Sequence, residues 1–405
     1  MQRSGSADLP LHYGRVPPWL AERMSKLGGA IVENIVQEYG RDAFLERISH
    51  PGWFQSLGCV LGMDWHSSGI TTAVMGALKK ALNPRSRELG IYICGGRGKH
   101  SRQTPAELSG IAEQTGLDGN YLAHCSRLAA KVDNAAVQDG FQLYLHSFIL
   151  VREGRWAVVQ QGMNEASRLA RRYHWHSSQL RSFVEDPHTA VIGRNMGPIL
   201  NLTCPEAAGT RDAMLRLSCS LDPGDFLRQM QHITMPAHHA VHAQDVNQKR
   251  LGAVLALAHD LQPARFQDLL LLKGVGPRTL QSLALVSEVI HGTPSRFDDP
   301  ARFSFAHGGK DGHPFPVPLR TYDETIRELK AAVESARIDH TEKRQAISQL
   351  HKMSLEVEQH FVHNNRFGEW LEKEKNTSHL YGGRTVHGPA KKPKTAIQAT
   401  QLSLF

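Results

Sequence analysis

Acidic residues, histidines and a lysine are concentrated at two places in the first half of the chain, where they could act together on a phosphate ester. Six of them are expected to be catalytic: Asp64, His66, Lys131, Asp133, Asp139 and His146. Carboxylate oxygens are the ligands that Mg²⁺ and Mn²⁺ prefer, and nearby cations stabilise the charge that develops on a phosphate during hydrolysis. The pattern therefore predicts metal-assisted phosphodiester hydrolysis, with Mg²⁺ or Mn²⁺ held by Asp64, Asp133 and Asp139. Helix capping by Ser68 or Thr71 and hydrogen bonding within a sheet are the alternative, structural roles for these stretches.

A glycine-rich basic segment, residues 95–102, follows an expected buried strand. It carries Arg97, Lys99 and Arg102 among its glycines, and such loops expose backbone N–H groups that bind phosphate. Its spacing is not that of a Walker A loop, and a solvated surface loop is the alternative. Residues 171–176 mix cations with aromatic side chains, a composition typical of surfaces that stack on nucleic acid and also of helix surfaces.

Two glycines on either side of a valine separate two amphipathic helices that are expected within residues 264–290. Gly274 and Gly276 permit a tight turn, and backbone N–H groups at the start of the second helix can then approach a DNA phosphate. The stretch resembles the helix-hairpin-helix motif of DNA polymerases, ligases, nucleases and glycosylases, which implies binding to duplex backbone; a structural αα-hairpin is the alternative. The residues expected to bind DNA, including those of the basic segment, are Arg97, Lys99, Arg102, Lys273, Gly274, Val275, Gly276, Arg278 and Thr279.

The same region permits a second interpretation. In DNA glycosylases with this motif, a catalytic Lys follows the glycine turn in some members and a catalytic Asp lies beyond the second helix. Arg278 stands at the Lys position here, and Asp298 and Asp299 stand near the Asp position. Because Arg does not release its proton to act as an amine nucleophile, the resemblance leaves only an Asp-assisted base-excision mechanism open.

The last five residues resemble the peptide motif that binds the bacterial replication sliding clamp. They are Gln401, Leu402, Ser403, Leu404 and Phe405. They follow a basic, acid-free segment rich in Gly, Pro and Thr, which predicts a flexible tether with an apolar tip that orders in the groove of a partner. A packed C-terminal strand is the alternative.

Composition bounds the class of protein. The formal net charge is +8 and the pI is about 9.3, which fits a polyanionic partner such as DNA. Five cysteines without a CxxC pair indicate neither a disulfide framework nor a zinc ribbon. We expect a cytoplasmic, nucleoid-associated protein without a membrane span.

Hydrophobic periodicity predicts an α+β fold with helices over 20–39, closed by Gly40, and over 71–82, and a strand over 89–94. A β-hairpin is predicted over 141–161, with Gln142, Tyr144 and His146 on one face of its first strand. Further helices are expected over 205–217, 222–230, 245–261, 264–272, 278–290 and 322–363. The predicted domains are a mixed α/β catalytic unit (1–235), an all-α unit with the helix-hairpin-helix (236–365), a flexible basic tether (366–400) and the clamp-binding peptide (401–405).

The chain from residue 5 to the loop 306–312 and the helix after it resembles a prokaryotic family, domain of unknown function seven-six-three. The stretches that begin at Phe54, Met63, Lys131 and Gln160 carry this resemblance. It implies no activity. The residues alone favour a metal-dependent nuclease, ahead of a glycosylase-like enzyme and a non-enzymatic DNA-binding adaptor.

Overall fold

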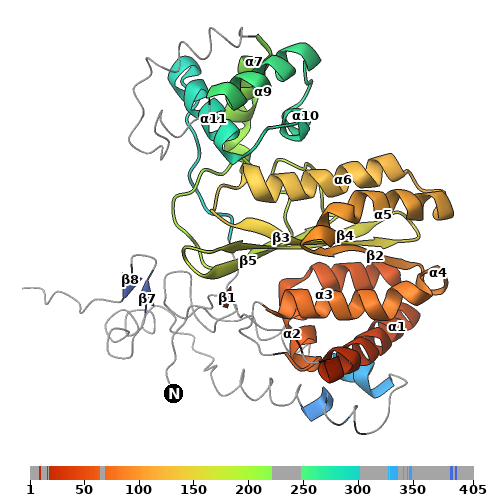
Figure 1. Cartoon of the computed structure of the whole chain (residues 1–405). Helices are drawn as coiled ribbons and strands as arrows, with labels where there is room; N and C mark the ends of the chain where they lie inside the picture. Colours follow the sequence, from red (N-terminus) through yellow and green to blue (C-terminus); the bar gives the residue numbers. More distant parts are fainter. Residues whose placement is uncertain are drawn as a thin grey trace, which may run out of the picture.

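The computed structural model describes residues 9–10, 16, 18–63, 69–220, 248–301, 327, 329–335, 341, 344, 346–348, 384–385 and 388–389. Within them, an antiparallel sheet lies between two layers of helices, and a further group of helices sits above one layer (Figure 1). The predicted mixed α/β character of the first part of the chain is confirmed. Several predicted features lie outside the described part. They are Asp64, His66, the helix 222–230, the last five residues, and the tether apart from its four described residues.

The sheet is built around a meander of four strands. These are β2 (Ile91–Arg97), β3 (Gln142–Val151), β4 (Trp156–Asn164) and β5 (Leu169–His176), and they pair in sequence order. The short strands β1 (Leu9–Pro10) and β6 (Ala190–Ile192) both pair with β5. The predicted β-hairpin is thus confirmed as β3 and β4, because alternating apolar residues around a short Gly-containing turn favour this pairing.

A β-bulge in β3 changes which side chains share a face. The register shifts between Leu143 and Leu145, so that one extra residue is inserted and the alternation restarts beyond it. His146 consequently bonds to Gln160 on one face, whereas Tyr144 bonds to Gln161 on the other. The prediction that Tyr144 and His146 lie on one face is wrong for this reason.

The lower face of the sheet is covered by α1 (Pro18–Ser49), α2 (Pro51–Val60) and α3 (Gly69–Leu82) (Figure 1). Their apolar faces form one buried cluster with sheet residues such as Ile149 and Val159. Gly40 interrupts α1 with a backbone φ of 87°, so the predicted helix end at this residue is a sharp kink after which a second helix starts. Asn83–Arg85 (η1) and Ser86–Leu89 (α4) lead into β2.

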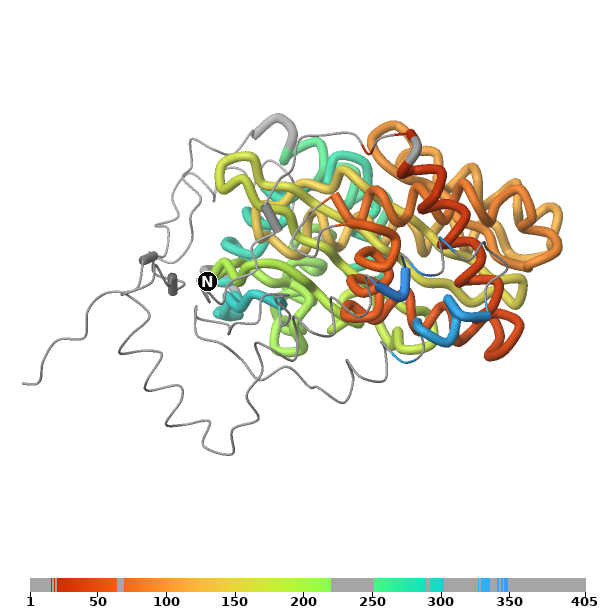
Figure 2. The backbone as a smooth tube through the Cα atoms, turned by 90° about the horizontal axis from the view of Figure 1, so that it is seen from below, coloured from red at the N-terminus to blue at the C-terminus, as the bar shows by residue number. Residues whose placement is uncertain are grey.

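The upper face is covered by α5 (Lys99–Thr115), α6 (Gly119–Lys131) and the π-helix η2 (Val132–Ala136). The helices above them are α7 (Ala208–Ser220), which follows η3 (Pro205–Ala207), α9 (Gln248–Leu261), α10 (Phe266–Leu271) and α11 (Pro277–His291). Both views place this group toward one end of the sheet (Figures 1 and 2). One buried cluster joins it to the sheet, since Leu269 and Leu280 belong to the same cluster as Trp156 and Trp175. Two short strands, β7 (Arg384–Thr385) and β8 (Gly388–Pro389), pair separately.

Residues 171–176 form the interior of β5, and every side chain of this stretch is buried. They therefore belong neither to a stacking surface nor to a helix surface, and both interpretations of their composition are wrong. Arg171 and Arg172 point to opposite faces of the sheet, as successive strand residues must, and each finds hydrogen-bond acceptors there. The two arginines can be buried because their hydrogen-bond acceptors are buried with them.

None of the helices in the described ranges combines the length and the apolar character that a membrane span needs.

Candidate functional site

Asp133 is fully buried in η2, at the centre of a polar network on the upper face of the sheet. Its Oδ2 accepts hydrogen bonds from Gln160 Nε2 at 2.6 Å and from Trp175 Nε1 at 3.0 Å. Its Oδ1 lies 2.5 Å from His188 Nε2. Burial raises the pKa of the Asp133 carboxyl, and the nearby His188 imidazole opposes that rise. Both carboxyl oxygens are thus already engaged by side chains of the sheet and of the loop after it.

The network continues from Gln160 to His146 and Ser126. His146 Nδ1 lies 2.8 Å from Gln160 Oε1, and Ser126 Oγ lies 2.8 Å from His146 Nε2. Because an amide oxygen can only accept, Nδ1 must carry the proton, and the neutral ring then accepts from the serine hydroxyl at Nε2. Burial lowers the pKa of His146 to about 4. His146 is therefore neutral and buried, with a hydrogen-bond partner at each ring nitrogen.

Asp139 belongs to a second buried group, centred on Arg171. Its Oδ2 accepts from Arg171 Nη1 at 2.9 Å and from the Tyr173 hydroxyl at 2.6 Å. On its other side, Arg171 makes a bidentate pair with Asp299, at 2.9 and 2.6 Å. Burial raises the pKa of Asp139, and Arg171 opposes the rise. Burial would lower the pKa of Arg171, but the two carboxylates reverse this and raise it.

The predicted metal ligands Asp133 and Asp139 both take part in these contacts. Asp133 and Asp139 each accept hydrogen bonds from protein N–H and O–H groups, so neither presents an open pair of oxygens to a shared cation. Among the described residues, no group of three His, Cys, Asp or Glu is arranged to hold a metal ion. Asp64, the third predicted ligand, and His66 lie outside them. The contacts of Asp133 and Asp139 therefore do not fit a shared metal site.

The basic segment, residues 95–102, forms the end of β2 and the start of α5. Arg97, Lys99 and Arg102 are all exposed, and the guanidinium of Arg97 lies 5.8 Å from the centre of the Tyr144 ring. Gly95 is required by the fold, because its φ is +81° and a Cβ there would lie 2.2 Å from the backbone oxygen of His146. The structure therefore presents the three predicted DNA-binding cations to solvent at one end of the sheet.

The glycine turn, which we call the hairpin (residues 272–276), joins α10 to α11. Lys273 and Arg278 are exposed, while Val275 is 2% and Thr279 is 7% exposed. Gly274 needs to be glycine because its φ is +91°. The first hydrogen bond of α11 is donated by Leu280 N to Gly276 O at 3.0 Å, so the N–H groups ahead of it in the first turn have no partner within the helix.

Gly276 differs from Gly274 in a way that bears on function. Its backbone is extended, with φ −152° and ψ −178°, a conformation that any residue adopts. Apart from the two neighbours in the chain, a Cβ built at this position meets no atom of the described residues within 4 Å. Nothing in the described part of the protein therefore demands glycine at the start of α11.

The predicted catalytic Lys131 lies at the hairpin and not at the carboxylates. Its Nζ donates a hydrogen bond to Val275 O. Gln138, which the sequence did not single out, donates to Pro277 O at 2.8 Å. Sequence reasoning also missed His188, Trp175 and Arg171 as partners of the two carboxylates.

A family model described as "Protein of unknown function (DUF763)" matches residues 5–317. The chain belongs to this family. The resemblance seen in the sequence is thereby confirmed, and the described network and hairpin both fall within the matched region. No curated protein and no solved structure matches the chain.

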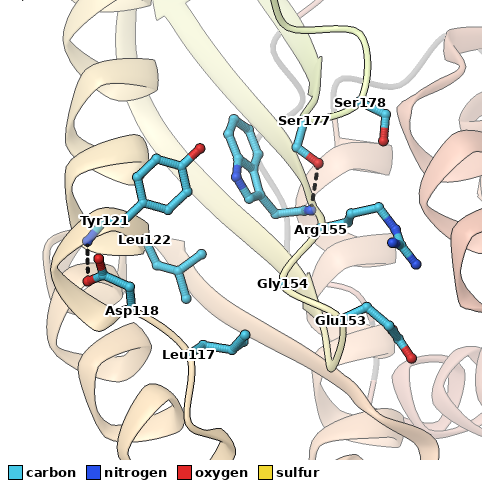
Figure 3. Close-up of a pocket in the computed structure, with 10 residues that line it drawn as sticks. Leu117, Asp118, Tyr121, Leu122, Glu153, Gly154, Arg155, Ser177 and Ser178 are labelled. Carbon is cyan, nitrogen blue, oxygen red and sulfur yellow. Dashed lines mark hydrogen bonds between the residues drawn. The ribbon is translucent and has the colours of Figure 1, made fainter.

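A surface hollow of about 420 Å³ lies at the turn between β3 and β4 (Figure 3). Asp118, Tyr121, Arg155, Trp156 and Ser177 are among the residues that line it. Its polar groups serve the fold: Asp118 accepts from Tyr121 N at 3.0 Å, Ser177 accepts from Trp156 N at 2.9 Å, and Arg155 pairs with Asp42. It contains none of the predicted site residues.

Proposed function

We propose that this protein binds the backbone of duplex DNA through the hairpin and the start of α11 and processes the bound DNA. The observation that carries the proposal is Gly276, which is glycine although its conformation and its described surroundings permit a side chain. A residue without a side chain is required where another molecule must come close to the backbone. At the start of a helix, that molecule is best an anion, since the first-turn N–H groups and the helix dipole both favour negative charge.

The charges around the hairpin support the same partner. Lys273 within the hairpin and Arg278 just after it are exposed, and the basic segment adds Arg97, Lys99 and Arg102. Such contacts go to phosphates and read no bases. Binding should therefore be independent of sequence and weaken steeply as salt rises.

The processing reaction is proposed to be cleavage of the phosphodiester backbone with a divalent metal. Asp133 and Asp139 are occupied within the fold, so Asp64 is the acid of the predicted set on which this reaction depends. It stands five residues ahead of α3, and Thr71 in the first turn of α3 borders the buried Arg172 at 3.4 Å. The last five residues, 401–405, are proposed to bring the protein to the replication sliding clamp through their apolar side chains.

The hairpin is tested by placing a negative charge at Gly276 without harming the helix. Asp and Asn both cap helix N-termini better than Gly does, so Gly276→Asp and Gly276→Asn should fold equally well. A carboxylate about 4 Å from a phosphate opposes binding by about 1 to 4 kcal/mol. In fluorescence anisotropy with a labelled duplex, Gly276→Asp should therefore bind at least about fivefold more weakly than Gly276→Asn.

Gly209→Asp is the control, because it makes the same change in net charge at another glycine whose Cβ position is open. It should bind as the wild-type protein does. Equal affinities for Gly276→Asp and Gly276→Asn would contradict DNA binding through the start of α11.

The cleavage reaction is tested on single-stranded, duplex, forked and uracil-containing DNA with Mg²⁺, with Mn²⁺ and with EDTA, resolved on denaturing gels. We expect metal-dependent breaks that Asp64→Asn abolishes while DNA affinity is retained. Breaks that appear in EDTA only after alkali treatment would indicate base excision in place of hydrolysis. Intact DNA under every condition would indicate a non-enzymatic DNA-binding adaptor.

A further inference from the structure

Two backbone carbonyls at the hairpin are bound by side chains from a distant part of the sequence. Val275 O accepts from Lys131 Nζ, and Pro277 O accepts from Gln138 Nε2 at 2.8 Å. Gln138 Nε2 also lies 3.3 Å from Ala135 O. Lys131 is the last residue of α6 and Gln138 lies between α6 and β3, both more than a hundred residues before the hairpin.

These bonds set the direction in which the hairpin presents its polar groups. A carbonyl oxygen carries partial negative charge and would repel a phosphate, whereas an N–H group attracts it. Val275 O and Pro277 O each face a donor of the protein itself. The Val275 side chain is also buried in the common core, so the middle of the turn is held on two sides.

The segment between the two donors is itself firmly held. It is the π-helix η2, in which Val137 N donates to Val132 O at 3.1 Å. Asp133 within it is bound by Gln160 and Trp175 of the sheet. Short π-helical segments are rare and frequently occur at functional sites. A rigid turn anchored in the sheet therefore carries one donor at each end.

The same segment leads directly into β3, which pairs with β2. Arg97, at the end of β2, is paired with Leu145 near the start of β3. The basic segment and the contact with the hairpin therefore belong to the same end of the sheet. A fixed relation between them would let one stretch of duplex backbone touch both.

We propose that Lys131 and Gln138 are positioning residues for DNA, which hold the hairpin against the sheet so that its N–H groups and the basic segment face one duplex. This assignment rests on the proposed function, and it gives Lys131 a role other than the catalytic one predicted from the sequence. The partner is the sugar-phosphate backbone of a duplex long enough to reach both surfaces.

The first test needs no DNA. Hydrogen exchange of peptides that cover residues 272–280 should be slow in the wild-type protein and at least about tenfold faster in Lys131→Met, because a charged hydrogen bond to the turn is lost. Lys131→Arg, which can still donate to Val275 O, should restore slow exchange. Unchanged exchange in Lys131→Met would overturn the holding role, whether or not the protein binds DNA.

The second test measures duplex affinity over a series of salt concentrations. Lys131→Met should weaken binding about tenfold and leave the slope of log Kd against log salt unchanged, because no phosphate contact is removed; Lys131→Arg should recover most of the affinity. Lys99→Met is the matched control, since loss of a direct phosphate contact lowers the slope by about one. A lowered slope for Lys131→Met would overturn positioning in favour of direct contact.

The two proposals fail differently. If Gly276→Asp does not weaken binding relative to Gly276→Asn, the hairpin is not the DNA site and both proposals are lost. If Gly276→Asp weakens binding but Lys131→Met and Gln138→Met leave it at the wild-type value, only the positioning role is lost.

Discussion

His146 should make the stability of this protein fall in mildly acidic solution. The imidazole is buried between Ser126 and Gln160, and its pKa is lowered from 6.5 to about 4. The unfolded chain therefore binds a proton at this residue at a higher pH than the native protein does. The stabilisation due to the neutral ring is complete above pH 6.5 and is lost as the pH falls toward about 4.

The size of this effect follows from the shift. One pKa unit corresponds to about 1.4 kcal/mol, so the whole shift is worth about 3 kcal/mol, and about 2 kcal/mol of it is lost by pH 5. Urea unfolding at pH 7.5 and pH 5 measures the loss. His146→Gln keeps a donor and an acceptor but does not titrate, so it should lose about 2 kcal/mol less than the wild-type protein over this interval.

Other groups titrate in the same pH range. The change in unfolding free energy between the two pH values is therefore compared between the wild-type protein and the variant. His100→Gln, at an exposed position on α5, should follow the wild-type curve. Parallel pH dependences for wild type and His146→Gln would refute the conclusion that His146 is held neutral by burial.

Two further predictions concern stability. Gly95→Ala places a methyl group 2.2 Å from a carbonyl oxygen of the facing strand, at a φ of +81°. It should therefore lower the unfolding free energy by about 2 kcal/mol or more in urea titrations. Gly110→Ala, where the Cβ position is open, should not lower it, and equal stability of the two variants would argue against this strand geometry. Asp299→Asn leaves Arg171 with one carboxylate partner and should cost about 3 kcal/mol. Glu113→Gln, at an exposed position on α5, should change stability by less than about 0.5 kcal/mol. A thermal unfolding midpoint unchanged by Asp299→Asn would show that the pair is not formed.

Elements with local signals were predictable from the sequence. The β3–β4 hairpin has alternating apolar residues around a short turn, and α9, α10 and α11 have clear helical periodicity with glycines at the turn. In each case the residues that determine the structure are neighbours in the chain. Such elements require no knowledge of distant partners.

The buried strand β5 shows what local patterns cannot supply. Its residues 171–176 are polar and aromatic, so composition places them at a surface. Their burial depends on hydrogen-bond acceptors that lie far away in sequence, among them Asp139, Asp299 and Gln55. Lys131 is similar, because its acceptor at Val275 belongs to another region of the chain. A buried cation becomes predictable only once its acceptors are known.

The π-helical turn between α6 and β3 has a consequence for sequence comparison. A π-helix closes its hydrogen bonds over five residues instead of four, so η2 is equivalent to a single-residue insertion into an ordinary helix end. Removing one residue from Val132–Ala136 would let the turn close as an ordinary α-helix, because the residue that the wider turn accommodates is gone. A one-residue gap at this point in an aligned relative would therefore mark a protein that lacks the wide turn between the two donors to the hairpin.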